Sequence, residues 1–446
     1  MINTFSDKAP PQSPEAEQYV LGAMMLDRDI VPLVAGILRH EDFARPAHRV
    51  IFQALNNLYE QKAPIDLIAL SEELKRRNEL ESAGGLEYIA YLNSLVPTSA
   101  GVEYHAQIVK EKSLLRSLID ISQQFARRGY DAREEAAALL GEAEQRIVEI
   151  SQRGVYKPFV SLNDILLSIY ERIGELQEQG GAPSGLRTHF SHLDRLLGGL
   201  QPGDLILLAA RPAMGKTSLA MNIAQNVAMG SRRPVAVFSL EMAKEQLVLR
   251  MLSAESRIDS SRLKAGRLTE EEWISLTSAI GKLAEAPLFI DDTPSITVNQ
   301  MRAKARHLKA ERGDLALVVV DYLQLMQPQQ RGENRTQEIS EISRSLKSLA
   351  RELNVPVLAL SQLSRAVEQT SDKKPNLSHL RESGALEQDS DIVLFIYRED
   401  NYFPDSEKQN IADIIVAKHR NGPTGTIELY FLKEATRFTT LERNPA

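Results

Sequence analysis

Apolar residues recur at the spacing of amphipathic helices through the first 152 residues of the chain. The segment Glu15–Leu26 shows this pattern directly after Pro10, Pro11 and Pro14, and prolines suit the entry to a helix. The same spacing predicts further helices at Arg49–Gln61, Leu67–Arg77, Gly85–Leu95, Glu103–Arg128 and Ala132–Gln152. Because no chemical motif occurs in this part, we expect residues 1–152 to form an all-α domain for packing or assembly.

One isolated amphipathic helix is predicted over Asp164–Gln179, inside a linker that we place at residues 153–182. Its apolar stripe consists of Ile165, Ile169, Ile173 and Leu176. A lone helix between flexible joints has no core of its own, so this stripe must dock on another surface. That surface belongs either to the same chain or to a neighbouring subunit, and the sequence leaves both open.

Short apolar runs alternate with helical segments from residue 183 to the end, which predicts an α/β domain with a largely parallel sheet. The candidate strands are Leu205–Ala210, Val235–Ser239, Leu288–Ile290, Leu317–Asp321, Val357–Ser361, Ile392–Tyr397, Ala412–Lys418 and Thr426–Phe431. The first six mostly lack alternation, which is typical of buried central strands. The turn residues of Arg420–Gly425 predict a hairpin between the last two strands.

Composition restricts the class of protein further. A chain of 446 residues without cysteine has no disulfide or thiolate metal site, which suits a reducing cytoplasm. No apolar run is long enough to cross a bilayer, and acidic residues and prolines stand where a signal peptide needs an apolar run, so we expect a cytoplasmic protein without a membrane partner. The net charge of −7 implies that any nucleic acid is bound by local basic positions, brought together by assembly.

A phosphate-binding loop is predicted where the apolar strand Leu205–Ala210 runs into Gly215-Lys-Thr217 and a helix. In such a loop, consecutive backbone N–H groups at the helix N-terminus cradle phosphate oxygens. Lys216 would reach the β- and γ-phosphates of ATP, and the Thr217 hydroxyl would bind Mg²⁺. The usual pattern has glycine where this chain has Ala210. The predicted nucleotide contacts in the loop are Ala213, Met214, Gly215, Lys216, Thr217 and Ser218.

Three further polar residues follow predicted strands and suit ATP hydrolysis. Asp321 ends the run Leu315–Asp321 and would hold Mg²⁺, although an aspartate there can also simply cap a core strand. Glu241 follows Val235–Ser239 and would activate the attacking water, or else cap the next helix. Gln362 follows Val357–Ser361 and would hydrogen-bond the γ-phosphate, unless it is an ordinary polar loop residue.

In order and spacing, these motifs resemble those of the bacterial replicative DNA helicases of the DnaB type, which belong to the RecA-like hexameric helicases. The resemblance covers nearly the whole chain, and the family's phosphate loop also lacks the first glycine. It rests on the motifs Pro10–Glu17, Phe43–Phe52, Ala209–Thr217, Ser239–Met242, Asp321–Met326, Ser361–Arg365 and Lys418–Gly425.

The resemblance implies roles for residues whose chemistry is not evident from the sequence alone. Lys418 and Arg420 would act on the ATP of the adjacent subunit, and Arg250 would contact the nucleotide. On an extended chain, Lys418 and Arg420 face one side and His419 the other, as this role requires. Without the resemblance, a solvated basic turn would be the preferred interpretation.

Two polar segments follow strands near the predicted nucleotide site, Gln327–Arg335 and Lys373–Ala385, and we expect them to line a DNA channel. They lack interleaved aromatic residues, which favours contact with the DNA backbone over base reading. By resemblance, Arg381, Glu382 and Gly384 would meet phosphates of single-stranded DNA, Glu382 through its backbone N–H.

The resulting hypothesis is an all-α N-terminal domain and a RecA-like α/β domain (183–446) joined by a linker helix. Copies of the chain would form a homohexameric ring that uses ATP and Mg²⁺ to move along single-stranded DNA and unwind duplex. Movement from 5′ to 3′, primase and a helicase loader as partners are implied by the resemblance alone. The alternatives are a RecA-like recombinase or repair ATPase that coats DNA as a filament, and a scaffold that binds ATP without hydrolysing it.

Overall fold

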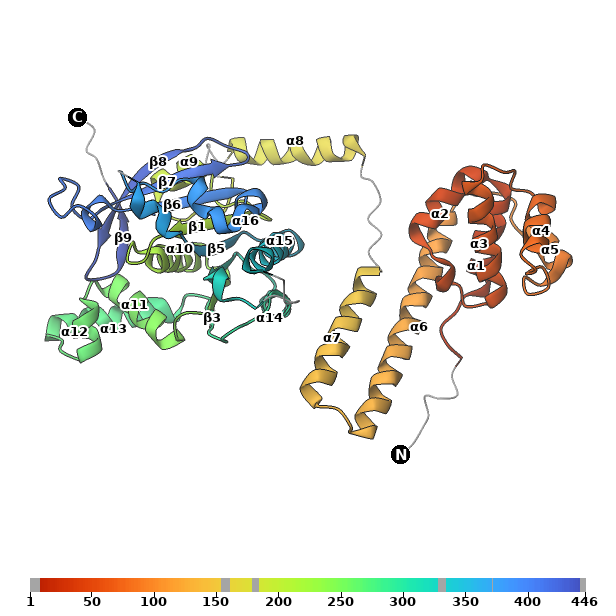
Figure 1. Ribbon diagram of the computed structural model, residues 1–446, viewed down its shortest axis with the longest axis horizontal. Helices are drawn as coiled ribbons and strands as arrows, with labels where there is room; N and C mark the ends of the chain where they lie inside the picture. The colour runs from red at the N-terminus through yellow and green to blue at the C-terminus, as the bar shows by residue number, and fades with distance from the viewer. Residues whose placement is uncertain (1–8, 154–160, 179–183, 328–333, 371, 442–446) are drawn as a thin grey trace. The chain divides into compact units, whose positions relative to one another are not determined.

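The computed structural model describes residues 9–153, 161–178, 184–327, 334–370 and 372–441 (Figure 1). Its contacts divide the chain into two compact units, Met1–Leu166 and Leu167–Ala446. This division falls inside the linker predicted at residues 153–182. The exact domain boundaries at 152 and 183 remain predictions. Among the described residues, no helix has the length and apolar character needed to cross a membrane.

The first unit is helical, as predicted. Its helices are α1 (Pro14–Leu26), α2 (Val31–Ile37), α3 (Pro46–Glu60), α4 (Leu67–Arg76), α5 (Gly85–Leu95), α6 (Val102–Asp131) and α7 (Ala136–Arg153). The core side chains Leu21, Met24, Leu55 and Leu92 are fully buried between α1, α3 and α5. The sequence pattern did not predict α2, whose seven residues include a proline and span barely two turns.

A buried polar network joins α1, α3 and α5 through this core. Glu17 is 1% exposed, accepts a hydrogen bond from the Ala44 N–H at 2.8 Å and lies 2.6 Å from His48 Nδ1. The other ring nitrogen of His48 lies 2.7 Å from the Tyr88 hydroxyl. Burial raises the pKa of Glu17, but the hydrogen bonds from His48 and Ala44 outweigh burial, so this pKa lies below its ordinary value.

The predicted linker helix is α8 (Leu162–Glu178), which begins two residues before the predicted start. Along its apolar stripe, Ile169 is 46% and Ile173 is 58% exposed. The side chain of Leu176 lies outside the described part of the chain. The stripe therefore presents exposed apolar surface.

The second unit contains a nine-stranded sheet in the order β3-β2-β4-β5-β1-β6-β7-β8-β9. The first six strands in this order are parallel, and β7, β8 and β9 add an antiparallel meander. The strands are β1 (Leu205–Ala210), β2 (Val235–Ser239), β3 (Leu288–Asp291), β4 (Leu317–Asp321), β5 (Val357–Gln362), β6 (Ile392–Tyr397), β7 (Ile411–His419), β8 (Gly425–Leu432) and β9 (Arg437–Thr440). The parallel sheet and the β7–β8 hairpin were predicted, whereas β9 was not.

Helices cover both faces of this sheet (Figure 1). Ile206 and Leu208 of β1 pack toward α9 (Ser191–Leu197), α10 (Lys216–Ser231) and α11 (Lys244–Ser256). Leu205, Leu207 and Ala209 pack toward α14 (Val298–Arg312), α15 (Arg335–Leu353) and α16 (Gly384–Asp389). Burial on both faces explains why the central strands read as continuous apolar runs. The remaining helices are α12 (Ser260–Ala265) and α13 (Glu270–Ala284), with 3₁₀ segments η3 (Leu323–Leu325), η4 (Arg365–Gln369), η5 (Leu377–Ser383) and η6 (Glu399–Asn401).

Candidate nucleotide-binding site

The carboxyl ends of the parallel strands meet at one edge of the sheet and bring the predicted residues together. Ala210, which precedes the phosphate loop, pairs in register with Gln362, and Ser239 pairs with Asp321. Glu241 follows β2 by two residues and therefore reaches the same edge. An open pocket of about 360 Å³ lies there. Its lining includes Ala213, Gly215, Lys216, Thr217, Ser218, Glu241, Arg250 and Gln362.

The phosphate loop has the backbone shape that its sequence predicts. Ala213 and Gly215 have φ values of 67° and 94°, so the chain turns through left-handed positions just before α10 begins at Lys216. Such turns direct successive backbone N–H groups into one concave anion site. A Cβ atom at Gly215 would lie 2.9 Å from Cζ of Phe438, so only glycine fits there. The side chain of Met214 is buried and packs in the core, which leaves only its backbone for the nucleotide.

Lys216 projects into the pocket beside an aromatic ring that the sequence analysis did not identify. Its ammonium lies 4.5 Å from the ring centroid of Tyr322, the residue after Asp321. Burial lowers the pKa of Lys216, and Asp321 and Glu241 oppose this shift. A phosphate group in the pocket would compensate the ammonium charge more directly than the ring does.

Thr217 and Asp321 form a pair suited to Mg²⁺. The Thr217 hydroxyl donates a hydrogen bond to Asp321 Oδ2 at 2.8 Å. Asp321 is 2% exposed, and its other carboxylate oxygen has no hydrogen-bond partner. Burial raises the pKa of Asp321, although Lys216 and Thr217 counteract it. An orphaned buried carboxylate oxygen beside a hydroxyl is a donor set that Mg²⁺ satisfies.

A hydrogen-bond chain connects Gln362 to the start of α15. The Gln324 side-chain amide donates to Ser361 Oγ at 2.8 Å and to the Gln362 carbonyl at 3.4 Å. Arg335, the first residue of α15, donates to the Gln324 carbonyl. Arg335 also ends the predicted DNA segment Gln327–Arg335, of which residues 328–333 lie outside the described part. Gln362 is thus connected through Gln324 to Arg335, the last residue of that segment.

Several pocket residues were missed by the sequence analysis. Arg211 donates to the Leu363 carbonyl at 2.9 Å and to Glu368, so it joins the phosphate loop to the segment after β5. Arg398, Lys433 and Thr436 also line the pocket, and they come from the part of the sheet formed by β6, β8 and β9. Arg398 directly follows β6, so the rule that strand ends carry site residues would have identified it. Lys433 and Thr436 lie in the turn before β9, a strand that was not predicted.

Lys418 and Arg420 lie near the amino-terminal ends of the parallel strands, whereas the pocket lies at their carboxyl ends. Because β7 is antiparallel to β6, His419 pairs with Ile392, which pairs on its other side with Ile206 near the start of β1. The phosphate loop follows the end of β1, and six residues of strand span about 17 Å. This distance exceeds the reach of a side chain, so the structure does not bring Lys418 and Arg420 to the pocket of their own chain.

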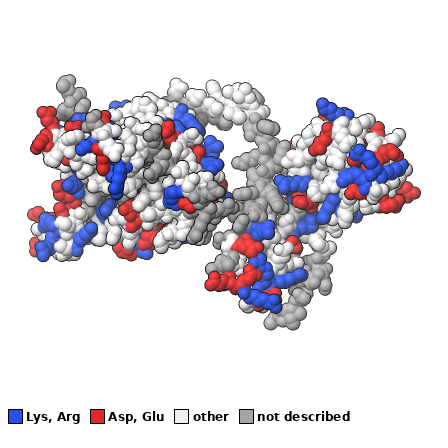
Figure 2. Space-filling model, in the orientation of Figure 1, with Lys and Arg blue, Asp and Glu red and all other residues white. Residues whose placement is uncertain are grey.

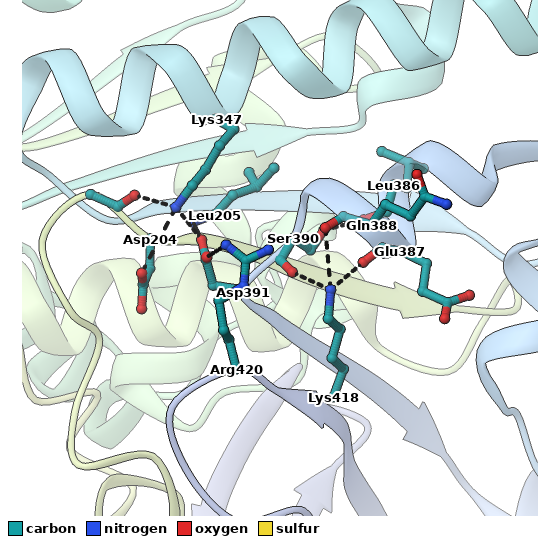
Figure 3. Close-up of polar contacts among 11 residues, drawn as sticks. Asp204, Leu205, Lys347, Leu386, Glu387, Gln388, Ser390, Asp391, Lys418 and Arg420 are labelled. Atoms are coloured by element: carbon teal, nitrogen blue, oxygen red, sulfur yellow. Dashed lines mark hydrogen bonds and ion pairs between the residues drawn. The ribbon is translucent and has the colours of Figure 1, made fainter.

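Both cations are instead held by groups at the start of β6 (Figure 3). Arg420 Nη1 lies 3.3 Å from Oδ1 of the buried Asp391, and the Arg420 side chain is 48% exposed. The Lys418 ammonium donates to the carbonyls of Glu387 at 2.5 Å and Ser390 at 2.7 Å. Burial lowers the pKa of Lys418, and the nearby charge of Arg420 lowers it further.

The predicted DNA contacts lie on one continuous segment beside this cluster. Arg381 and Glu382 belong to η5, and Gly384 is the first residue of α16. The side chains of Arg381 and Glu382 lie outside the described part of the chain. Their roles in DNA binding remain predictions.

Sequence comparisons match both units to one family. The model of the DnaB-like helicase N terminal domain matches residues 9–111, and that of the DnaB-like helicase C terminal domain matches residues 185–440. The chain is 52% identical to "Replicative DNA helicase DnaB" of Geobacillus stearothermophilus over 444 residues, covering 99% of this chain and 98% of that protein. It is 49% identical to "Replicative DNA helicase DnaC" of Bacillus subtilis (strain 168), with the same coverage of both.

Solved structures agree with these matches. A structure described as a DnaB-like replicative helicase and its interactions with primase has a TM-score of 0.79 and 36% identity, and covers 96% of this chain and 99% of its own. A solved ATPase domain has a TM-score of 0.61 and 42% identity over 64% of this chain and 100% of its own. These matches confirm the helicase hypothesis over the recombinase and the scaffold. The chain therefore belongs to the DnaB-like replicative helicases, a family of ATP-dependent DNA helicases with a helical N-terminal domain and a C-terminal ATPase domain.

Proposed function

We propose that the chain hydrolyses Mg²⁺-ATP at interfaces between copies of itself in a homohexameric ring, which moves along single-stranded DNA and unwinds duplex. One observation carries this proposal. The phosphate loop and the cationic pair Lys418 and Arg420 lie at opposite ends of the strands of one sheet. If both groups serve one nucleotide, the chain completes that site only by placing its phosphate-loop side against the cationic side of a second copy. Such a head-to-tail contact gives a ring when the rotation between copies closes, and the replicative helicase family of the chain favours the ring over a filament.

Each residue of the pocket then has a chemical task. Lys216 and the loop N–H groups bind the β- and γ-phosphates, and Mg²⁺ held by Thr217 and Asp321 would neutralise phosphate charge. Glu241 orients and deprotonates the attacking water, and Gln362 contacts the γ-phosphate. Arg250 lines the same pocket and contributes a further positive charge. Arg420 and Lys418 of the adjacent copy stabilise the charge that develops in the transition state.

The exposed stripe of α8 supports the same assembly. Ile169 and Ile173 expose apolar surface on a helix that follows the helical unit. A neighbouring subunit is a surface that can bury this stripe, and a linker that crosses to a neighbour would reinforce a ring.

DNA is bound by segments repeated around the ring. On the face shown in Figure 2, Lys and Arg are interspersed with Asp and Glu over both units, in keeping with a net charge of −7. Six copies of the segment Lys373–Ala385, in which Lys373, Lys374 and Arg381 outnumber Glu382, would create a positive lining that one copy lacks, with Arg381, Gly384 and the Glu382 N–H at the DNA phosphates. We further propose 5′ to 3′ movement, action at replication forks in the cytoplasm, and primase and a helicase loader as partners.

A strand-displacement assay on forked DNA, together with native mass spectrometry, tests this function. We expect a hexameric mass, and ATP- and Mg²⁺-dependent displacement that requires a single-stranded 5′ arm. A fork with only a 3′ arm is the matched control substrate. A monomer that hydrolyses ATP at full rate in the presence of single-stranded DNA would contradict the proposal.

A further inference from the structure

Three backbone carbonyl groups at the C-terminal end of α16 surround one ammonium group (Figure 3). Lys418 Nζ donates to the carbonyls of Glu387 at 2.5 Å, Ser390 at 2.7 Å and Gln388 at 3.3 Å. The last carbonyls of a helix have no partner within the helix, and a positive charge is favoured there. An ammonium has three N–H donors, so these contacts engage all of them. Lys418 therefore caps α16.

Arg420 lies two residues away and is bound quite differently. Its backbone N–H donates to the Asp391 carbonyl at 2.9 Å, but among the described residues its side chain makes one polar contact, at 3.3 Å with Asp391 Oδ1, and is about half exposed. The other carboxylate oxygen of Asp391 accepts from the Leu205 N–H at 2.9 Å and from the Lys347 ammonium, so Asp391 is itself fixed to β1 and α15. Arg420 can leave this position at small cost, whereas Lys418 has to give up a complete set of hydrogen bonds.

The helix that Lys418 caps is continuous with the proposed DNA-contacting segment. η5 ends at Ser383 and α16 begins at Gly384, with no residue between them. Leu380 of η5 and Leu386 of α16 are buried in the same core as α15. A helix of only six residues depends strongly on its ends, so loss of the cap would loosen the whole segment.

We infer that Lys418 is a positioning residue whose ammonium holds α16 and the DNA-contacting segment of its own subunit, and releases them when it turns to the γ-phosphate of the neighbouring ATP. The two tasks exclude each other because both need the same three N–H donors. This inference rests on the proposed interfacial site. It gives Lys418 a second task besides its contact with the phosphate, which is to couple the nucleotide to the DNA-contacting segment. Arg420 has the phosphate contact as its one task.

Hydrogen exchange measured by mass spectrometry on the full-length protein tests this role, with peptides that cover residues 384–391. The variant Lys418→Met keeps the aliphatic stem of the side chain and removes its N–H donors. Without nucleotide, we expect hydrogen exchange in this peptide of the variant to be at least about tenfold faster than in wild type, because charged hydrogen bonds contribute roughly 1.5–3 kcal/mol. Arg420→Met, the matched control on the same side of the strand, should exchange at the wild-type rate. Peptides from β4 report whether each variant remains folded.

In a second experiment, hydrogen exchange is measured with a non-hydrolysable ATP analogue bound. Added to wild-type hexamers, it should raise exchange in residues 384–391 toward the level of Lys418→Met and cause no further rise in that variant. Wild-type protection of this peptide in Lys418→Met, or unchanged wild-type protection with the analogue bound, would overturn the inference. Full ATPase activity in Arg420→Met would instead contradict the interfacial site, so the two failures are distinguishable.

Discussion

Asp321 keeps one carboxylate oxygen without a hydrogen-bond partner although the residue is almost completely buried. Its neighbours Lys216 and Thr217 compensate only part of the cost of burying this charge, and burial still raises the pKa of Asp321. This incomplete compensation is why we propose that Asp321 and Lys216 bind a cation and a phosphate, whose charges would complete it.

Removal of the phosphate-loop lysine tests this residue-scale account. Lys216→Ala should lower kcat/KM for ATP hydrolysis by at least about 100-fold, because we propose that the Lys216 ammonium in the pocket stabilises the phosphate charge of the transition state. Lys244→Ala is the matched control, since Lys244 is an exposed lysine paired with Asp292 outside the pocket. Steady-state rates of ATP hydrolysis by the two variants test this prediction. Comparable losses of kcat/KM in Lys216→Ala and Lys244→Ala would argue against a specific phosphate contact of Lys216.

A second residue-scale prediction concerns Glu17 in the helical unit. Its folded pKa lies below the ordinary value of 4.5, so the stability it contributes is present above that value and is lost as pH falls through the folded pKa. Glu17→Gln should lower the free energy of unfolding by about 1.5–3 kcal/mol at pH 7 and flatten its decline below pH 4.5. Urea unfolding of the full-length protein at several pH values measures both, and an unchanged pH slope would refute the role of Glu17.

At the scale of elements, the sequence predicted most of what surrounds the nucleotide. β1, β2, β4 and β6 were predicted to the residue, because long apolar runs between turn signals have one interpretation in a doubly covered sheet. Short elements were missed: α2 spans seven residues, and β9 reads Arg-Phe-Thr-Thr after a turn. Missing β9 also hid Lys433 and Thr436, whose place in the pocket depends on that strand.

The hairpin of β7 and β8 gives the first element-scale prediction. Arg420→Ala should lower kcat for ATP hydrolysis by roughly 10³-fold while ATP binding stays within about twofold of wild type. His419→Ala, on the other side of the same strand, should retain wild-type kcat. ATPase kinetics and equilibrium nucleotide binding separate the two effects, and a loss of binding equal to the loss of kcat would place Arg420 elsewhere.

The apolar stripe of α8 gives the second prediction at the scale of elements. Ile173→Asp puts a charge on its apolar face, so the hexamer should dissociate into smaller species and lose hydrolysis in parallel. Glu171→Gln on the same helix should leave the hexamer intact. Native mass spectrometry at fixed protein concentration measures the distribution of assembly sizes, and an undisturbed Ile173→Asp hexamer would contradict docking of the stripe on a neighbouring subunit.

At the scale of the whole molecule, the two halves of the proposed site, the phosphate loop and the cationic pair Lys418 and Arg420, lie too far apart to meet within one chain. The sequence supplied the residues of both halves, but the separation of the halves depends on strand order and on the antiparallel direction of β7, which no local pattern encodes. Under our proposal, their place at opposite ends of the strands makes assembly a condition of catalysis. The same proposal connects Lys418 to the segment proposed to hold DNA, because Lys418 donates to the carbonyls of Glu387 and Ser390 at the end of α16.

Mixing two inactive variants tests this central claim most directly. Arg420→Ala subunits keep an intact pocket, and Glu241→Ala subunits keep an intact cationic edge, so each mixed interface of the right polarity contains one complete site. We predict that the two proteins, each nearly inactive alone, regain ATP hydrolysis when they are mixed and allowed to exchange subunits. Mixed rings that form, as seen by native mass spectrometry, yet hydrolyse no more ATP than either variant alone would contradict a nucleotide shared between two copies of the chain.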